Sequence, residues 1–215
     1  MKKIAIFMLT VTLMLSTAAW HNGEHSANAA SVSFSDIQGH WAADSINGAV
    51  AKGYVDGYPD GTFGPDVTVS RAEFVKMMVV ALGLEVGLAN GKWYTPYVDA
   101  AQAAGIYVPG DFGDPYWDKP LTRLEMSKVA VRALDITDVE PTQWMYHATQ
   151  NGIINGTAPG ELSPDGTTTR AQAVTVIERV LAVKDGQELP VDKYAVSAAE
   201  IMWHNTNIMT MLPRY

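Results

Sequence analysis

The sequence contains no cysteine in its 215 residues, so neither a disulfide nor a cysteine-liganded metal site can hold the fold together. Basic residues are fewer than acidic ones, 15 against 23, which gives a formal net charge of −8. We therefore do not expect nucleic acid or an anionic lipid surface as a partner. Any anionic ligand must be held by locally placed arginines, because the overall charge would repel it.

Sequence motifs for catalysis or metal binding are also lacking. There is no His-Glu-x-x-His, no Gly-x-Ser-x-Gly and no phosphate-binding glycine loop. Three histidines stand isolated from one another: His40, His147 and His204. The segment 56–61 is similar to a calcium loop, but Tyr58 and Val67 occupy positions where an EF-hand needs oxygen ligands. We expect no metal, no cofactor and no enzymatic activity.

The N-terminus has the features of a secretory signal peptide. Lys2 and Lys3 precede an apolar stretch from Ile4 to Ala19, and Ala27-Asn28-Ala29 is a small-residue cleavage site. The apolar stretch is short for a membrane-spanning helix, and no later segment is long and apolar enough to span a bilayer. We expect residues 1–29 to be removed and the mature chain to be secreted, with no membrane contact after cleavage.

The rest of the chain repeats itself around three arginines. Each arginine follows a hydroxyl residue and precedes Glu or Gln by two positions: Ser70-Arg71-Ala72-Glu73, Thr122-Arg123-Leu124-Glu125 and Thr169-Arg170-Ala171-Gln172. A glycine lies 18 residues before each arginine, at Gly53, Gly105 and Gly152. A leucine lies 11 residues after each, at Leu82, Leu134 and Leu181. These spacings divide the chain into unit one (32–84), unit two (92–136), unit three (138–183) and a C-terminal tail (184–215).

Each unit is predicted to be a helix, a loop and a second helix. The hydroxyl and the Glu or Gln form a capping-box pattern, so the second helix should begin at each arginine. First helices are expected at about 40–52, 94–104 and 142–151, and glycine can end each of them. Two helices cannot bury their own apolar face, whereas three stacked units can. We expect an all-α fold in which Leu82, Leu134 and Leu181 face a common interior and the tail docks on the bundle.

The arginines are oddly placed for a purely structural role, because a cation in the first helical turn opposes the helix macrodipole. Arg71, Arg123 and Arg170 are therefore predicted to grip an anion beside free backbone N–H groups. The alternative is structural pairing with a carboxylate from a neighbouring unit. Trp41 and Trp93, each 12 residues before a unit's glycine, suit the wall of a sugar-binding groove and the core equally well.

Unit one resembles an S-layer homology (SLH) repeat. The similarity lies in Phe34-Ser35-Asp36-Ile37, His40-Trp41-Ala42, Gly53-Tyr54-Val55, the segment 57–63 and Ser70-Arg71-Ala72-Glu73. Units two and three match at the glycine, the following apolar pair and the Thr-Arg signature. The resemblance implies three repeats in a pseudo-threefold bundle at the cell wall or S-layer of a Gram-positive bacterium. It also implies non-covalent attachment to secondary cell-wall polysaccharide, typically pyruvylated.

In that family, ligand grooves form between adjacent repeats and the signature arginine holds the acidic sugar. The resemblance therefore implies Arg71, Arg123 and Arg170 as binding residues, with Ser70, Thr122 and Thr169 beside them. Further candidates for ligand binding in these grooves are Asp36, Trp41, Trp93, Gly53, Gly105 and Gly152. Unit two replaces the loop sequence of unit one by the segment 110–115, and unit three has Gln172 where Glu is usual. The three grooves need not be equivalent.

Two other functions stay open at this point. The bundle could be a structural S-layer subunit that acts mainly through assembly with other surface-layer proteins. It could also belong to a wall-active enzyme whose catalytic residues carry no recognisable motif.

Overall fold

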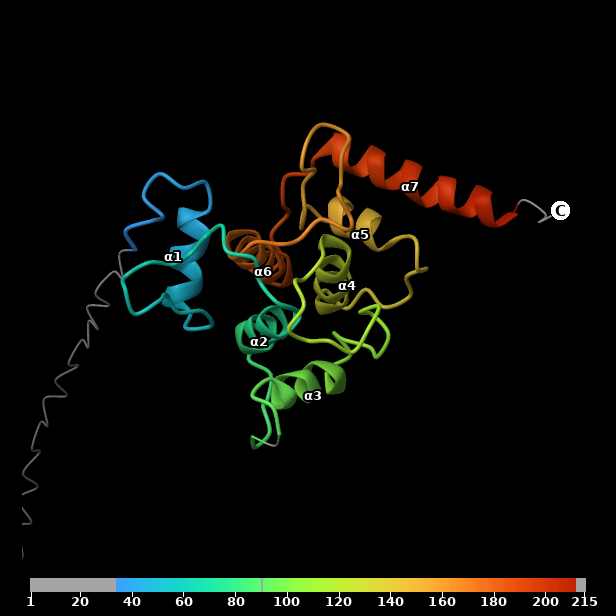
Figure 1. The fold of residues 1–215 in the computed structure, drawn as a ribbon. Helices are drawn as coiled ribbons and strands as arrows, with labels where there is room; N and C mark the ends of the chain where they lie inside the picture. Colours follow the sequence, from blue (N-terminus) through green and yellow to red (C-terminus); the bar gives the residue numbers. More distant parts are fainter. Residues whose placement is uncertain (1–33, 90, 212–215) are drawn as a thin grey trace, which may run out of the picture. The chain divides into compact units, whose positions relative to one another are not determined.

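The computed structural model describes residues 34–89 and 91–211, and this part of the chain confirms the all-α prediction (Figure 1). Its helices are α1 (Ala43–Ala51), α2 (Arg71–Ala81), α3 (Thr95–Ala103), α4 (Arg123–Ala133), α5 (Trp144–Gln150), α6 (Arg170–Lys184) and α7 (Lys193–Met211). The predicted signal peptide, residues 1–29, lies outside the described residues. No helix in the described ranges has both the length and the hydropathy to cross a membrane.

The three capping boxes form as predicted. Helices α2, α4 and α6 each begin at the signature arginine, with Ser70, Thr122 or Thr169 as the N-cap. In each case the cap hydroxyl accepts the N–H three residues on, and the Glu or Gln side chain accepts the N–H of the cap residue. The first helices start without a side-chain cap, so their boundaries were harder to predict: α1 begins at Ala43, not His40.

A ring of three backbone hydrogen bonds joins the units at the centre. The N–H of Val69 donates to the carbonyl of Thr168 over 3.0 Å, that of Thr168 to Leu121 over 2.9 Å, and that of Leu121 to Val69 over 2.9 Å. All three residues are completely buried. Because each unit contributes one equivalent residue, the ring marks a pseudo-threefold axis.

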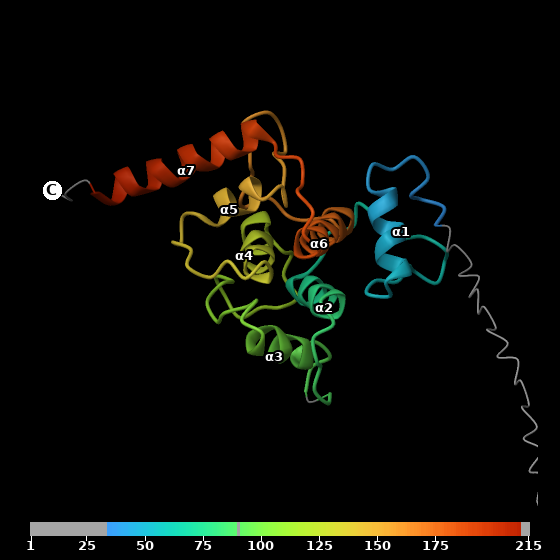
Figure 2. The ribbon, with the colours of Figure 1, turned by 180° about the vertical axis from the view of Figure 1, so that it is seen from behind.

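The helices follow the same cyclic order (Figures 1 and 2). The second helices of the units lie in the middle, where α6 packs on both α2 and α4. Each first helix packs on the second helix of another unit: α1 on α6, α3 on α2, and α5 on α4. No unit is therefore self-contained, and the buried core, which includes Phe74, Met126 and Ile177, is shared by all three.

The three repeated leucines are less buried than predicted. Leu82, Leu134 and Leu181 pack against the core but are only partly covered. They lie at the C-terminal end of their helices: Leu82 and Leu134 are the C-cap residues of α2 and α4. The fully buried positions come earlier, at Met78, Ala130 and Ile177.

The C-terminal tail docks, as expected, and it does so as a long helix. Ala195 and Ala199 of α7 are completely buried, and α7 packs on α5. Asp192 holds the start of α7, because one carboxylate oxygen accepts the N–H groups of Tyr194 and Ala195 over 3.0 and 3.1 Å. Its other oxygen accepts the N–H of Gly156 over 3.1 Å, which ties the tail to the loop of unit three.

Candidate functional site

Each signature arginine reaches across to the next unit. Arg71 of unit one contacts the loop of unit two, Arg123 of unit two contacts the loop of unit three, and Arg170 of unit three contacts unit one. The arginines are therefore placed at the three boundaries between units, where the resemblance puts the grooves. Their partners differ from one boundary to the next, and so does what each guanidinium can still bind.

Arg71 is held by carboxylates of unit two. Its Nε and Nη2 donate to the two carboxylate oxygens of Glu125 over 3.1 and 2.5 Å. Its Nη1 donates to Oδ1 of Asp114 over 2.8 Å and to the carbonyl of Tyr116 over 2.9 Å. Burial pushes the pKa of Arg71 down, but the hydrogen bonds that it donates to Glu125 and Asp114 outweigh burial and raise the pKa overall. At this boundary, the Arg71 side chain therefore forms a structural ion pair with the neighbouring unit.

Arg123 is equally buried but has no acidic partner. Its Nε donates to the carbonyl of Leu162 over 2.8 Å and its Nη2 to the carbonyl of Asn155 over 2.7 Å. Among the described residues, no carboxylate forms an ion pair with Arg123. Burial lowers the pKa of Arg123, and no nearby charge offsets it. A buried cation without a counterion is costly, which makes this arginine a candidate to bind an anion.

Arg170, like Arg123, donates to backbone carbonyls, but it also contacts aromatic rings. Its Nε donates to the carbonyl of Phe63 over 3.1 Å and its Nη2 to the carbonyl of Asp56 over 3.0 Å. The guanidinium also lies over the rings of Phe63 and Tyr58, at 4.7 and 5.1 Å from their centroids. These contacts fix its position, and no carboxylate in the described part of the chain forms an ion pair with it.

The backbone N–H groups beside the arginines are not free, contrary to the prediction. The N–H of Arg123 donates to the carbonyl of Gly166, and that of Leu124 to Pro164, both over 2.9 Å. The next N–H is taken by the cap hydroxyl of Thr122. The other two boundaries repeat this pattern. The neighbouring unit's loop therefore satisfies the helix start, and an anion would have to be held by side chains.

The boundary at Arg123 contains a pocket of about 390 Å³, which we call groove A. Its walls include Arg123 of α4, Arg179 of α6, Gln172 of α6 and the segment 154–157 of unit three. Trp41, contributed by unit one, completes the lining and is 63% exposed. The lining contains two arginines and no acidic residue, although the protein as a whole carries a net charge of −8.

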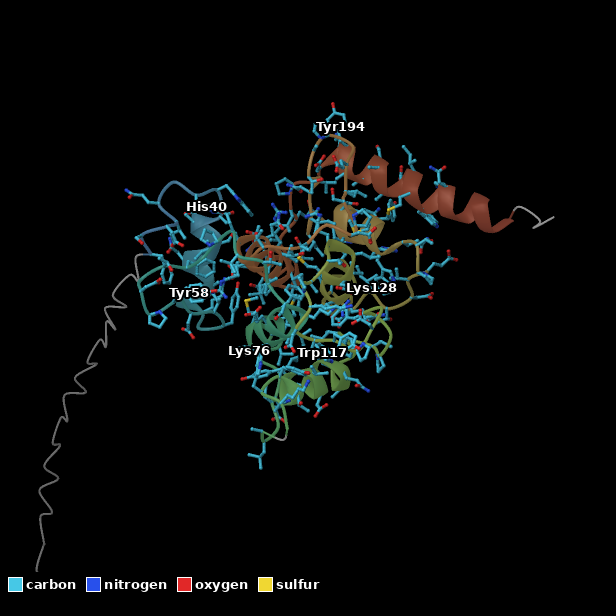
Figure 3. All side chains as sticks on the ribbon, in the orientation of Figure 1. His40, Tyr58, Lys76, Trp117, Lys128 and Tyr194 are labelled. Carbon is cyan, nitrogen blue, oxygen red and sulfur yellow. The ribbon has the colours of Figure 1, made fainter. Side chains whose placement is uncertain are left out.

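The boundary at Arg170 contains the corresponding pocket, groove B, of about 300 Å³. Trp93 of unit two takes the place of Trp41 and is 52% exposed. Arg170 takes the place of Arg123, and Lys76 supplies a second cation on α2 (Figure 3). The residues that line groove B also include Asp56 and Glu73, so two cations are balanced by two carboxylates.

The boundary at Arg71 lacks the matching tryptophan. The residue 12 positions before Gly152 is Glu140. The tryptophan of unit three is displaced to Trp144, which is 5% exposed and packs under Arg132 at 4.5 Å. This boundary therefore lacks the exposed tryptophan found in grooves A and B, and its arginine is already bound to Glu125.

The remaining predicted site residues have structural contacts. Ser70, Thr122 and Thr169 use their hydroxyls as helix caps. Asp36 accepts the N–H groups of Phe63 and Gly64 over 2.8 and 2.7 Å; partial burial raises its pKa, but these bonds lower it overall. Three glycines lie just after the first helices, with φ values of 75°, 71° and 68° that favour glycine: Gly53, Gly105 and Gly152.

Two cations of the grooves were missed at the level of sequence, Lys76 and Arg179. Each position is basic in two units only: Lys76 corresponds to Lys128 and Thr175, and Arg179 to Arg132 and Val80. A search for residues shared by all three units therefore passes over them, and only the packing of the second helices against the next loop brings them into the grooves. His40 and His147 lie in different units, and the described residues contain no cluster of three or more metal-ligating side chains.

Comparison with known proteins agrees with this geometry. The family model of the S-layer homology domain matches residues 33–75 and 135–174, which lie mainly in units one and three. The chain belongs to the S-layer homology family. An S-layer protein of Bacillus thuringiensis subsp. finitimus is 30% identical over 177 residues, 70% of this chain and 21% of that protein.

Other relatives of this SLH chain carry different names. The exoglucanase XynX of Acetivibrio thermocellus is 31% identical over 178 residues, 70% of this chain and 16% of the exoglucanase. A cellulosome-anchoring protein of the same species is 50% identical over 56 residues, 26% of this chain and 12% of that protein. The SLH chain thus corresponds to a small part of each of these relatives, about a fifth of their length or less.

Proposed function

We propose that this chain is a non-covalent cell-wall-anchoring module that binds anionic, pyruvylated secondary cell-wall polysaccharide through grooves A and B. The observation that carries the proposal is groove A, where buried Arg123 forms no ion pair with any carboxylate of the described residues and faces a pocket walled by an exposed tryptophan. A pyruvyl ketal supplies the missing carboxylate. The relatives that are named as S-layer and cellulosome-anchoring proteins support a role at the cell surface.

The two tryptophans give the grooves a sugar-binding character. Trp41 and Trp93 are the exposed aromatic side chains on the groove walls, and each leaves more than half of its surface exposed. An exposed indole is unfavourable in water, whereas the apolar face of a sugar ring covers it well. A cation for the carboxylate and an indole for the ring together recognise an acidic sugar.

The boundary at Arg71 is not part of the proposed binding surface. The guanidinium already has the ligand that the glycan would offer, since Glu125 forms two hydrogen bonds with it and Asp114 a third. Displacing Glu125 would leave a buried carboxylate without its counterion. We therefore expect two working grooves from three repeats.

The organisation of the chain fits an exported module. We place SLH repeats at 32–84, 92–136 and 138–183. The middle repeat has the same helix pair, capping box and central hydrogen bond as the others. Secretion would follow removal of residues 1–29, which N-terminal sequencing of the exported protein tests; a chain that begins at Met1 would contradict it. The expected location is the cell wall or S-layer of a Gram-positive bacterium.

Sedimentation with purified wall sacculi tests the function. The wild-type protein should sediment with sacculi, and the double variant Trp41→Ala, Trp93→Ala should stay in the supernatant. Tyr194→Ala is the matched control, because Tyr194 is a 72% exposed aromatic on α7 that lines neither groove (Figure 3).

Three outcomes would count against the proposal. If the wild-type protein does not sediment with the sacculi, the chain does not bind the wall. Self-assembly without sedimentation would favour a structural S-layer subunit instead. Sedimentation of the double variant at the wild-type level would remove the grooves from the binding surface. Release of soluble sugars from the sacculi would point to an enzyme.

A further inference from the structure

One position separates groove A from the other two boundaries. The residue two places after the signature arginine is Glu73 in unit one, Glu125 in unit two and Gln172 in unit three. All three residues complete a capping box, so Gln172 serves the helix start as well as a glutamate does. They differ in what they present to the arginine of the preceding unit.

Glu125 shows what a carboxylate can do at this position, because it binds Arg71 through both oxygens, whereas Glu73 accepts from its own cap residue Ser70. Gln172 stands in the equivalent place beside Arg123 and lines groove A. An uncharged amide cannot neutralise the guanidinium. Gln172 and Asn155 stand where groove B has Glu73 and Asp56. These two amides leave groove A with a formal charge of +2, from Arg123 and Arg179, whereas groove B sums to zero.

Arg123 and Arg179 approach groove A from two different helices and meet the same loop. Nη2 of Arg123 donates to the carbonyl of Asn155 over 2.7 Å, and Nη1 of Arg179 donates to the carbonyl of Ile153 over 3.1 Å. Two carbonyls that are two residues apart are separated by at most about 7 Å. Both guanidinium groups thus bind one stretch of three residues, 153–155, and both line groove A.

Neither guanidinium has its charge compensated by the protein. Among the described residues, Arg179, like Arg123, forms no ion pair with a carboxylate. Burial lowers the pKa of both side chains, in line with two desolvated cations whose neighbours are carbonyls. The electrostatic cost of placing two cations in one pocket would be relieved when an anion enters.

We propose that Arg123 and Arg179 together bind one carboxylate of the wall glycan, and that Gln172 keeps this pair uncompensated, which makes groove A the dominant site. The inference rests on the proposed function and names the chemistry of its strongest groove. A carboxylate suits the pair because its two oxygens can each accept from a planar guanidinium. Groove B, whose cations face Asp56 and Glu73, contributes a weaker second contact.

The sharpest test is Gln172→Glu, which keeps the capping box and adds a carboxylate beside Arg123. Binding to purified pyruvylated wall polymer should weaken roughly 10- to 100-fold, the scale of a charge-assisted hydrogen bond. The matched variant is Glu73→Gln at the same repeat position of groove B, where removal of an acid should tighten binding. Thermal unfolding should show both variants folded.

A second variant addresses Arg179 directly. Arg179→Gln removes the charge but can still donate to the carbonyl of Ile153, and it should also weaken binding at least tenfold. Lys184→Gln is the control, because it removes a cation from the same helix whose partners, Ala133 and Asp135, lie outside the groove. Lys76→Gln in groove B should cost less than Arg179→Gln.

Four results would overturn the inference. They are unchanged binding by Gln172→Glu, unchanged binding by folded Arg179→Gln, a larger loss from Lys76→Gln than from Arg179→Gln, and equal losses from Arg179→Gln and Lys184→Gln. Equally tight binding of a phosphate-bearing wall polymer without ketal would show that the pair takes a phosphate instead of a carboxylate. Failure of the wild-type protein to bind any wall polymer would refute the proposed function itself, a separate outcome.

Discussion

Replacing Arg71 by alanine should destabilise the bundle far more than replacing the other two signature arginines. The side chain is 5% exposed and forms hydrogen bonds to Glu125, Asp114 and the carbonyl of Tyr116. Arg71→Ala leaves Glu125, itself 6% exposed, buried without a counterion. Breaking a buried pair in this way costs about 3–5 kcal/mol.

The comparison with Arg123→Ala sets the scale. Arg123 gives up two hydrogen bonds to carbonyls and leaves no buried carboxylate behind, so its loss should cost about 1–3 kcal/mol. The difference should be visible in urea unfolding followed by the far-ultraviolet circular dichroism of the helices. For a chain of this size, each kcal/mol also lowers the melting temperature by about 2–4 °C.

A double variant separates the pair from general disruption. Adding Glu125→Gln to Arg71→Ala removes the unpaired charge and keeps a side chain that can complete the capping box, as Gln172 does. It should recover about 1–3 kcal/mol of the loss. If Arg71→Ala unfolds at the same urea concentration as the wild type, or if Glu125→Gln adds to the damage, the pair does not hold units one and two together.

Three further predictions concern stability. Hydrogen bonds from Lys119 foremost, and from Tyr116 and Arg71, lower the pKa of Asp114 from 3.8 to about 2. The stability that Asp114 contributes should therefore be full above about pH 4 and lost as the pH falls through 2. In a plot of melting temperature against pH, Asp114→Asn should flatten this acidic region. The buried hydroxyl of Thr168 has no hydrogen-bond partner, and Thr168→Val, which matches the apolar residues of the central ring, should raise the unfolding free energy by about 1–2 kcal/mol. Leu134→Ala should cost about 1–2 kcal/mol, less than the 2–5 of a fully buried leucine, because the side chain is only partly covered; calorimetry distinguishes the two values.

The helix starts could be predicted from the sequence because the interactions that define them are local. The hydroxyl, the Glu or Gln three residues later and the helix between them lie within one turn, and all three capping boxes form. The first helices lack such a cap, and their boundaries shifted by a few residues. A helix start that is fixed by reciprocal hydrogen bonds within one turn can therefore be predicted from the local sequence alone.

The roles of the arginines could not be predicted, because their partners lie far away in the sequence. Arg71 meets Glu125 across 54 residues, and Arg170 meets Phe63 across 107. The macrodipole argument correctly set the arginines apart from ordinary helix residues but could not separate ligand contact from structural pairing. The structure gives Arg71 a structural pairing and leaves Arg123 without an acidic partner.

The cyclic packing of the units explains the two tryptophans, which the sequence left between core and groove. Trp41 lines a groove whose other walls belong to units two and three, and Trp93 lines one formed by units one and three. Each first helix packs on another unit, so the neighbours of its side chains cannot be inferred from its own repeat. Their exposure and their place beside an arginine now favour the groove.

The central claim is that an anionic sugar of the wall polymer fills grooves A and B. Titration of the purified protein with pyruvylated wall polymer, and with the same polymer after removal of its ketals, tests this claim most directly. We predict saturable binding to the first polymer and at least a tenfold loss of affinity for the second, the scale of one lost charge-assisted hydrogen bond. Equal affinity for the two polymers would contradict the account.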